Sequence, residues 1–457
     1  MEKMEFIKDL VSKSRAAQQK FESFTQEQVD GICKAIAKVV YDNAEPLAKL
    51  AHEESRMGVY KDKINKNLGK AKIIWHDMEG EKSVGIIKEE KDKGLIYVAK
   101  PMGVIAAITP CTNPIVTPMC NAMFALKGRN SVIIAPHPRS KKCAKVLVDM
   151  FNKVIEPFGA PENLIQVIEE PAIELSGMLM SEADVTIATG GAGVVKAAYS
   201  SGKPAFGVGP GNVQCIIDNG VDIKTAVPKI VAGRIFDNGI ICSGEQTIIA
   251  PRGDYDAIIA EFKANGAYYT EDEAEVQKIR DTVFPNGVMN KDLVGKSIQV
   301  VADAAGIKIP EGTKLIIAKA GAIGFDDVLS KEKMCPLMSS YAYDTWEEAV
   351  DIAIANLEYE GKGHSVSIHS NNRENIEYAG NKLPVSRILL NQICSTMNGG
   401  SFVNALAPTT TLGCGSWGNN SISENLSWRH LFNVSRIASE LDKKVPTDDE
   451  IWGVNGK

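Results

Sequence analysis

The residue of this sequence best placed for covalent chemistry is Cys242, within the stretch Phe236–Gln246. Upstream, apolar residues recur at helical spacing over 227–235, and Gly239 is expected to end that helix. Downstream, residues 246–250 are β-branched and apolar, as in a buried strand. A thiol on a short connection between two anchored elements can act as a nucleophile. A buried structural cysteine is the alternative interpretation of Cys242 taken alone.

Asn113 follows a predicted buried strand at 103–109, inside the sequence Thr109-Pro-Cys-Thr-Asn-Pro114. The carboxyl ends of parallel strands form the ligand-binding edge of a sheet, so we expect the Asn113 amide at that edge. An amide N–H there can donate to the oxyanion that forms when a nucleophile adds to a carbonyl. Asn-Pro turns are common, so Asn113 is informative only in combination with Cys242.

A glycine-rich turn follows another predicted strand, at 184–188, where Thr189, Gly190 and Gly191 lead into a helix. Glycines let backbone N–H groups approach a phosphate, and the start of a helix favours its negative charge. The spacing falls short of the full dinucleotide-binding fingerprint. A plain tight turn between strand and helix therefore explains these glycines equally well.

A basic stretch follows the predicted strand at 131–135, where the adenosine ribose of a dinucleotide would lie. Arg139, Lys141 and Lys142 supply positive charge, and the stretch 135–142 contains no carboxylate. This combination would accommodate the 2′-phosphate of NADP. A solvated, basic helix start is the alternative.

The order of the predicted elements indicates an α/β fold. Predicted strands alternate with helical segments, as in a doubly wound sheet, at 103–109, 131–135, 164–168 and 184–188. A second α/β unit is expected from 213 to 404, and the tail past Ser421 is expected to add a helix.

Local signals place further elements. Thr25–Gln28 resembles a capping box, and residues 84–99 are typical of two strands joined by a polar turn. Such a hairpin exposes strand edges, so an oligomer contact is its natural use and a surface hairpin the alternative. Another helix is expected to have Thr117 as its N-cap and Pro118 as its first residue, and to end at Gly128.

Composition narrows the function classes. A chain of 457 residues should hold two or three domains, and its net charge of −6 gives no general attraction for nucleic acid or anionic membranes. No apolar run approaches the length of a membrane span, and the first residues lack the apolar core of an export signal. The nine cysteines form no Cys-x-x-Cys pair and the six histidines lack ligand spacing, which predicts a cytoplasmic protein without a metal site.

Taken together, these segments resemble the aldehyde dehydrogenase superfamily, specifically its coenzyme A-acylating branch. The resemblance is greatest in residues 103–114, 196–204, 207–212, 411–417 and around Cys242. It implies an α/β, aldehyde dehydrogenase-like fold with a Rossmann-type cofactor domain at 1–212 that carries an oligomerisation hairpin at about 83–101. A catalytic domain at 213–404 and a C-terminal segment at 405–457, returning to the cofactor domain and the oligomer interface, would complete a homodimer.

The resemblance also implies residue roles. Cys242 matches the nucleophile, Asn113 the side-chain donor of the oxyanion hole, and His364 a histidine associated with thioester chemistry. Glu332 matches the glutamate that holds the nicotinamide ribose. The implied cofactor-binding residues are Thr109, Pro110, His137, Pro138, Arg139, Ser140, Lys141, Thr189, Gly190, Gly191, Gly211 and Glu332. NADP(H) is the preferred cofactor on this interpretation, and NAD(H) is the alternative.

One departure from the wider superfamily indicates the reaction. Hydrolytic members carry a glutamate that activates water, whereas the matching stretch here, 204–212, contains no carboxylate. Without a general base, attack by water loses roughly 10²–10⁴-fold, while a thiol remains a strong nucleophile near neutral pH. Acyl transfer to coenzyme A is therefore expected rather than hydrolysis. Glu245 lies near Cys242 in sequence but is left without a role.

Within the family, residues 39–45, 331–336, 343–350 and 445–453 are similar to enzymes that act on succinate semialdehyde. The expected reaction interconverts succinyl-CoA and succinate semialdehyde, with acetyl-CoA and acetaldehyde as the alternative pair. Ser243 and Ser401 are the candidate donors to the substrate carboxylate, because no arginine clamp is recognisable. A hydrolytic dehydrogenase and a catalytically silent binding protein are the remaining alternatives.

Overall fold

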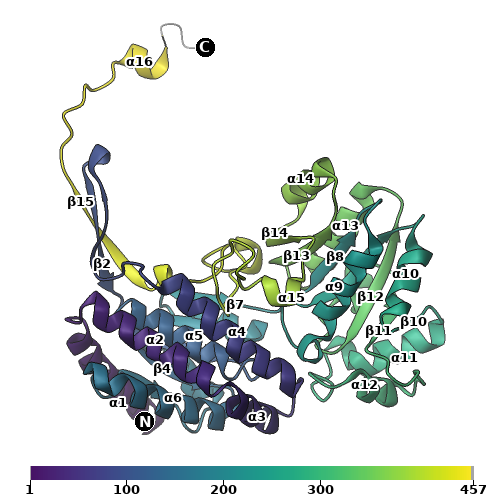
Figure 1. Cartoon of the computed structure of the whole chain (residues 1–457), viewed down its shortest axis with the longest axis horizontal. Coiled ribbons are helices and arrows are strands. Elements are labelled where there is room, and N and C mark those ends of the chain that lie inside the picture. The colour runs from purple at the N-terminus through teal and green to yellow at the C-terminus, as the bar shows by residue number, and fades with distance from the viewer. Residues whose placement is uncertain (1, 454–457) are drawn as a thin grey trace.

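The structure is a computed structural model that describes residues 2–453. Figure 1 shows two α/β bodies side by side, with a narrow sheet that projects from the first. The chain between α15 and β15 lies between the two bodies (Figure 1). In the described chain no helix is both long and apolar enough to cross a membrane.

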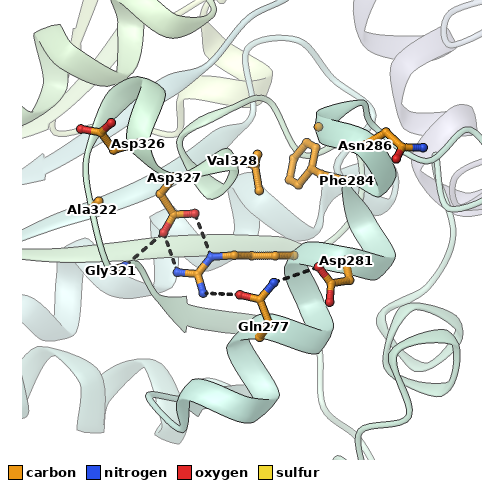
Figure 2. A pocket seen from close by; sticks show the side chains of 11 residues that line it. Gln277, Asp281, Phe284, Asn286, Gly321, Ala322, Asp326, Asp327 and Val328 are labelled. Atoms are coloured by element: carbon orange, nitrogen blue, oxygen red, sulfur yellow. Dashed lines mark hydrogen bonds and ion pairs between the residues drawn. The ribbon is translucent and has the colours of Figure 1, made fainter.

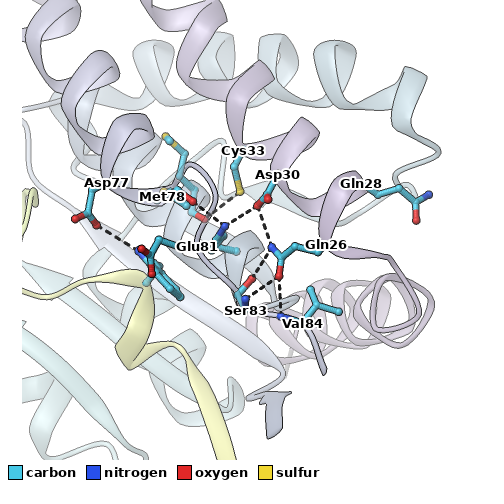
Figure 3. Close-up of polar contacts among 12 residues, drawn as sticks. Gln26, Gln28, Asp30, Cys33, Asp77, Met78, Glu81, Ser83 and Val84 are labelled. Carbon is cyan, nitrogen blue, oxygen red and sulfur yellow. Dashed lines mark hydrogen bonds and ion pairs between the residues drawn. The ribbon is translucent and has the colours of Figure 1, made fainter. Parts of the chain in front are cut away.

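Four helices open the chain and pack on the first body. Their bounds are α1 Glu2–Phe21, α2 Gln26–Asp42, α3 Ala44–Ser55 and α4 Tyr60–Met78. The predicted capping box is confirmed, since Thr25 and Gln28 each accept the other's backbone N–H. Figure 3 shows how Gln26 of α2 also accepts N–H groups of Ser83 and Val84, which fixes the root of the projecting hairpin.

The first body contains a five-stranded parallel sheet of order β5-β4-β3-β6-β7. Its strands are β3 Val104–Thr109, β4 Ser131–Pro136, β5 Ile165–Val167, β6 Val185–Thr189 and β7 Ala205–Val208. The covering helices are α5 Val116–Lys127, α6 Lys141–Ile155, α7 Ile173–Glu182 and α8 Ala192–Tyr199. Every predicted strand of this body is confirmed. Continuous burial of β3 and β4 explains why they are apolar without alternation.

The start of α5 differs from the prediction. Ile115 is the N-cap, so Thr117 and Pro118 are the second and third helical residues. Proline is tolerated there because the first turn of a helix has no intrahelical partner for its N–H groups. The predicted end at Gly128 is confirmed.

The second body contains a seven-stranded parallel sheet of order β10-β11-β12-β9-β8-β13-β14. Its strands are β8 Val213–Ile217, β9 Glu245–Pro251, β10 Ala267–Thr270, β11 Leu315–Lys319, β12 Leu337–Tyr343, β13 Gly363–His369 and β14 Val385–Leu390. Its helices are α9 Ile223–Ile235, α10 Tyr255–Ala264, α11 Glu273–Val283, α12 Ile298–Ala305, α13 Trp346–Tyr359, α14 Arg373–Lys382 and α15 Cys394–Met397. The predicted strand after Cys242 is confirmed as β9, which is buried throughout.

The helix before Cys242 ends earlier than predicted. Helix α9 stops at Ile235, and Asp237, Asn238 and Gly239 then all take positive φ angles. Non-glycine residues rarely adopt this conformation, so tertiary contacts must hold it. The carboxylate of Asp237 supplies them by accepting the backbone N–H of Val59 and pairing with two lysines of α4.

The projecting sheet has the order β1-β2-β15 and is antiparallel. The predicted hairpin is confirmed as β1 Gly85–Glu90 and β2 Leu95–Pro101. The third strand, β15 Phe432–Ala438, stands where the sequence predicted only a helical tail. A helix does occur further on, but α16 spans only Asp448–Trp452.

Candidate active site

Cys242 lies on the loop between α9 and β9 and lines a cavity of about 390 Å³. Helix α4, the start of α5 and the loop 395–412 form the other walls. Burial, followed by the nearby carboxylate of Glu332, raises the pKa of the Cys242 thiol to about 12. The resting side chain is therefore a thiol, which would have to lose its proton to act as a nucleophile.

Asn113 lines the same cavity as Cys242. Lys66 Nζ donates to Asn113 Oδ1 at 2.7 Å, which turns the amide nitrogen of Asn113 away from the lysine. Within residues 2–453, no hydrogen bond involves that nitrogen, so it is available as a donor. The positive charge of Lys66 is balanced by Asp237 at 2.5 Å. The loop that carries Cys242 and the amide of Asn113 are thus tied to the same lysine.

Gly211 connects three of the predicted site residues. Its N–H donates to Glu332 Oε1 at 3.2 Å. A Cβ built at position 211 would lie 1.8 Å from the carbonyl oxygen of Cys242 and 3.3 Å from Cε1 of His364. The structure therefore brings Cys242, His364 and Glu332 together around one glycine, where only a hydrogen fits.

His364 lies in strand β13 and is fully buried. Ser365 Oγ accepts from Asn398 Nδ2 at 2.5 Å and from Arg387 Nε at 3.3 Å. Because both lone pairs of this hydroxyl are engaged, its own proton is directed at His364 Nδ1, 3.0 Å away. The histidine proton then sits on Nε2, which has no hydrogen-bond partner among the described residues. Burial, followed by the cation of Arg387, lowers the pKa of His364 to about 3, so the ring is neutral.

Arg387 is a site residue that the sequence did not reveal. It is buried in strand β14 and donates to the backbone carbonyls of His364 at 2.8 Å and Gly413 at 2.7 Å. Its charge acts to lower the pKa of Cys242 against the larger effect of burial. Its only sequence signal is a charged residue in a short, largely apolar strand, which resembles an ordinary edge position.

Glu332 and His364, which without the family resemblance look like surface residues, are both buried. Burial, followed by the neighbouring Glu360, raises the pKa of Glu332 to about 8. Glu245 is also buried, and its Oε1 accepts the N–H of Cys394 at 2.7 Å. It does not line the Cys242 cavity.

Most of the predicted cofactor residues lie along one edge of the five-stranded sheet, whereas Gly211 and Glu332 lie beside Cys242. Thr109, His137 and Thr189 stand at or just after the carboxyl ends of the neighbouring strands β3, β4 and β6. At Gly191, before α8, a Cβ would meet no atom within 4 Å, so space is open above the turn. An open glycine turn and a helix start, together with the buried carboxylate of Glu332, fit the phosphates and ribose of a nicotinamide dinucleotide.

The fold places carboxylates from other segments beside the basic stretch 135–142. Lys141 pairs with Glu170 at 2.5 Å. The carboxylate of Glu54, from α3, accepts the N–H groups of Lys142 and Cys143 at 2.8 Å each. The stretch itself contains no carboxylate, as the sequence shows, but the fold brings two carboxylates to it.

The two candidate serines differ in what their hydroxyls contact. Ser243 Oγ donates to the carbonyl of Ser395 at 3.0 Å, so its proton is already engaged. Ser401 Oγ accepts the N–H of Val403 at 3.2 Å and keeps its own proton available. Both residues line the Cys242 cavity.

A second cavity, of about 470 Å³, lies in the second body near α11. Arg280 and Asp327 cross-link its wall through two hydrogen bonds, of 2.9 and 2.6 Å. Figure 2 shows Asp327 among the residues that line this cavity. None of the predicted site residues lines it. The arrangement is a structural ion pair in an open hollow.

The chain belongs to the aldehyde dehydrogenase family, whose sequence profile matches residues 2–277. Within that family, it is 58% identical over 448 residues to the succinate-semialdehyde dehydrogenase (acetylating) of Clostridium kluyveri, with 98% of this chain and 99% of the relative covered.

Solved structures agree with this assignment. An acetylating aldehyde dehydrogenase from Geobacillus thermoglucosidasius matches with a TM-score of 0.93 at 37% identity, over 98% of this chain and 99% of the other. A propionaldehyde dehydrogenase from Rhodopseudomonas palustris, with bound CoA and an acylated cysteine, matches with a TM-score of 0.85 at 28% identity, over 95% and 97%. The predicted fold class and the resemblance to the acylating branch are confirmed.

Proposed function

We propose that this chain is a CoA-acylating aldehyde dehydrogenase that interconverts succinyl-CoA and succinate semialdehyde through a thioester on Cys242. The observation that carries the reaction type is the lining of the catalytic cavity. It contains the nucleophile and Asn113, but no carboxylate among the described residues. Without a base to activate water, an acyl group on Cys242 persists until a thiol collects it. The relative of 58% identity supports the succinyl substrate.

In the reductive direction, the sulfur of Cys242 attacks the carbonyl of succinyl-CoA and the coenzyme A thiol leaves. We assign the stabilisation of the oxyanion to Asn113 Nδ2 and the backbone N–H of Cys242. A reduced nicotinamide cofactor, with its ribose at Glu332, would supply the hydride that converts the thioester on Cys242 into a thiohemiacetal. Cleavage of the resulting thiohemiacetal then releases the aldehyde and restores the Cys242 thiol.

We assign His364 the role of a hydrogen-bond donor rather than that of a base for coenzyme A. With a pKa near 3, its imidazole is a weak base at neutral pH. The proton that its contacts place on Nε2 instead favours donation to an oxygen or sulfur that gains negative charge. Glu332 would hold the nicotinamide ribose through its carboxylate, as the family resemblance implies.

We also propose that the chain prefers NADP(H) to NAD(H). Arg139 and Lys142, near the carboxyl end of β4, support it, while the pairing of Lys141 with Glu170 weakens it. We further propose that the protein is cytoplasmic, which its nine unpaired cysteines support.

A homodimer formed through the projecting sheet is a further part of the proposal. The sheet leaves apolar residues exposed on both outer strands, with Ile86 of β1 48% exposed and Ile437 of β15 53% exposed. Exposed strand edges with apolar residues are natural pairing surfaces. Analytical ultracentrifugation of the wild type and an Ile86→Lys, Ile437→Lys variant tests this, and a monomeric wild type would contradict it.

The function is tested by measuring kcat/KM for succinyl-CoA and acetyl-CoA with NADPH and NADH side by side. We expect succinyl-CoA to be the better substrate and NADPH the better reductant. A preference for acetyl-CoA would instead establish the acetaldehyde alternative.

A further inference from the structure

Lys70 is an ammonium group in the catalytic cavity with no role in the chemistry described above. Helix α4 carries Lys63, Lys66 and Lys70 at spacings of three and four residues, so they share one face of the helix. Lys63 and Lys66 both pair with Asp237. Within residues 2–453, Lys70 forms no ion pair, and its charge is therefore uncompensated.

The contacts of Lys70 leave part of its donor capacity unused. Its Nζ donates to the backbone carbonyls of Gly399 at 2.7 Å and Thr409 at 3.1 Å. An ammonium group has three donors, so one N–H has no partner among the described residues. Lys70 lines the same cavity as Cys242, and the two are close enough that a Cys242 thiolate acts to raise the pKa of Lys70.

Burial nevertheless lowers the pKa of Lys70 to about 8, since the cation gains too little from two neutral carbonyls. A ligand that brings one negative charge would recover this lost stabilisation. Neutral donors such as Ser401 cannot do so. Apolar residues such as Val116, Met397 and Leu412 line the same cavity, which suits a short methylene chain between two polar ends.

We propose that Lys70 binds the distal carboxylate of the acyl substrate, so that the cavity selects acyl groups with a terminal anion. This inference rests on the proposed function, because it names the group that recognises the succinyl end. Lys70 would thus provide the cation for the substrate carboxylate, for which no arginine clamp is recognisable in the sequence.

The test compares succinyl-CoA with butyryl-CoA, which has the same chain length without the carboxylate. In a Lys70→Met variant, we expect the ratio of kcat/KM for the two substrates to fall roughly 100-fold, or about 2.7 kcal/mol. Lys70→Arg should restore most of the ratio. Lys61→Met, at an exposed position in the first turn of α4, makes the same charge change outside the cavity and should leave it unchanged.

An equal loss for both substrates in Lys70→Met would overturn the inference, because it would mean that Lys70 only ties α4 to the loop at 399–409 or contacts coenzyme A. Oxidation of succinate semialdehyde and butyraldehyde at one CoA concentration repeats the comparison with a common cosubstrate. Failure of the proposed function looks different, since the wild type would then prefer acetyl-CoA or butyryl-CoA. If the wild type prefers succinyl-CoA and Lys70→Met leaves the ratio of kcat/KM for succinyl-CoA and butyryl-CoA unchanged, the role of Lys70 is rejected and the proposed function is not.

Discussion

Replacement of Gly211 by alanine should disable the site through one added methyl group. The contact between the new Cβ and the carbonyl oxygen of Cys242 would have to lengthen from 1.8 Å to at least 3.0 Å, while Cε1 of His364 already lies 3.3 Å from the same Cβ. Gly211 is not among the glycines with positive φ, so alanine meets no backbone penalty there and the effect is purely steric. The loop that carries Cys242 must therefore move by more than about 1 Å.

Displacements of about 1 Å in a catalytic constellation cost roughly 10²-fold in rate, and overpacking destabilises the fold by about 1–3 kcal/mol. We therefore expect kcat/KM for succinyl-CoA to fall at least about 100-fold, while circular dichroism shows a folded protein. Gly209→Ala is the matched control, because a Cβ there meets no atom within 4 Å. A Gly211→Ala enzyme within about threefold of Gly209→Ala would refute the placement of Cys242 and His364 around Gly211.

Three further predictions concern individual side chains. Asn113→Ala should lower kcat about 10²–10³-fold through loss of the oxyanion donor, and steady-state rates that stay within tenfold of wild type would remove Asn113 from that role. Glu332→Gln removes a negative charge that raises the pKa of Cys242. Alkylation of Cys242 by iodoacetamide should therefore be faster in this variant between pH 9 and about 10. An unchanged pH dependence of the alkylation rate would contradict this effect of Glu332 on Cys242. Lys70 loses its proton as the pH rises through its pKa of about 8. Burial and the charge of Lys66 lower this pKa, whereas Cys120 and Cys242 act to raise it. The kcat/KM for succinyl-CoA relative to that for butyryl-CoA should therefore decline above pH 8. A flat ratio up to pH 10 would contradict carboxylate recognition by a Lys70 that titrates near pH 8.

The five-stranded sheet could be predicted from the sequence because its central strands are buried on both faces. Strands such as β3 and β4 are continuous apolar runs, and no tertiary contact is needed to recognise them. The end of α9 is different, since the left-handed turn at Asp237 is held by lysines about 170 residues earlier in the chain. Strand β15 alternates only over Phe432 to Val434 before charged and exposed residues break the pattern.

Cys242 could be proposed as a nucleophile from its setting in the sequence, whereas most of the residues around it could not be predicted. Lys66 and Lys70 lie on a charged helix that looks like an ordinary solvated face, and only the fold turns that face into a cavity wall. Arg387 gives only a weak signal in the sequence, because its carbonyl partners lie in the neighbouring strand β13 and in the loop at Gly413. Glu332 and His364 were recognised through the family resemblance, and their burial depends on segments far away in sequence.

The most direct test of the covalent mechanism is the dependence of product release on coenzyme A. With succinate semialdehyde and oxidised cofactor, we predict one equivalent of reduced cofactor per Cys242 without coenzyme A, and continuous turnover to succinyl-CoA only when it is added. Steady release of free succinate at a comparable rate in its absence would contradict the account, because it would show that this site activates water.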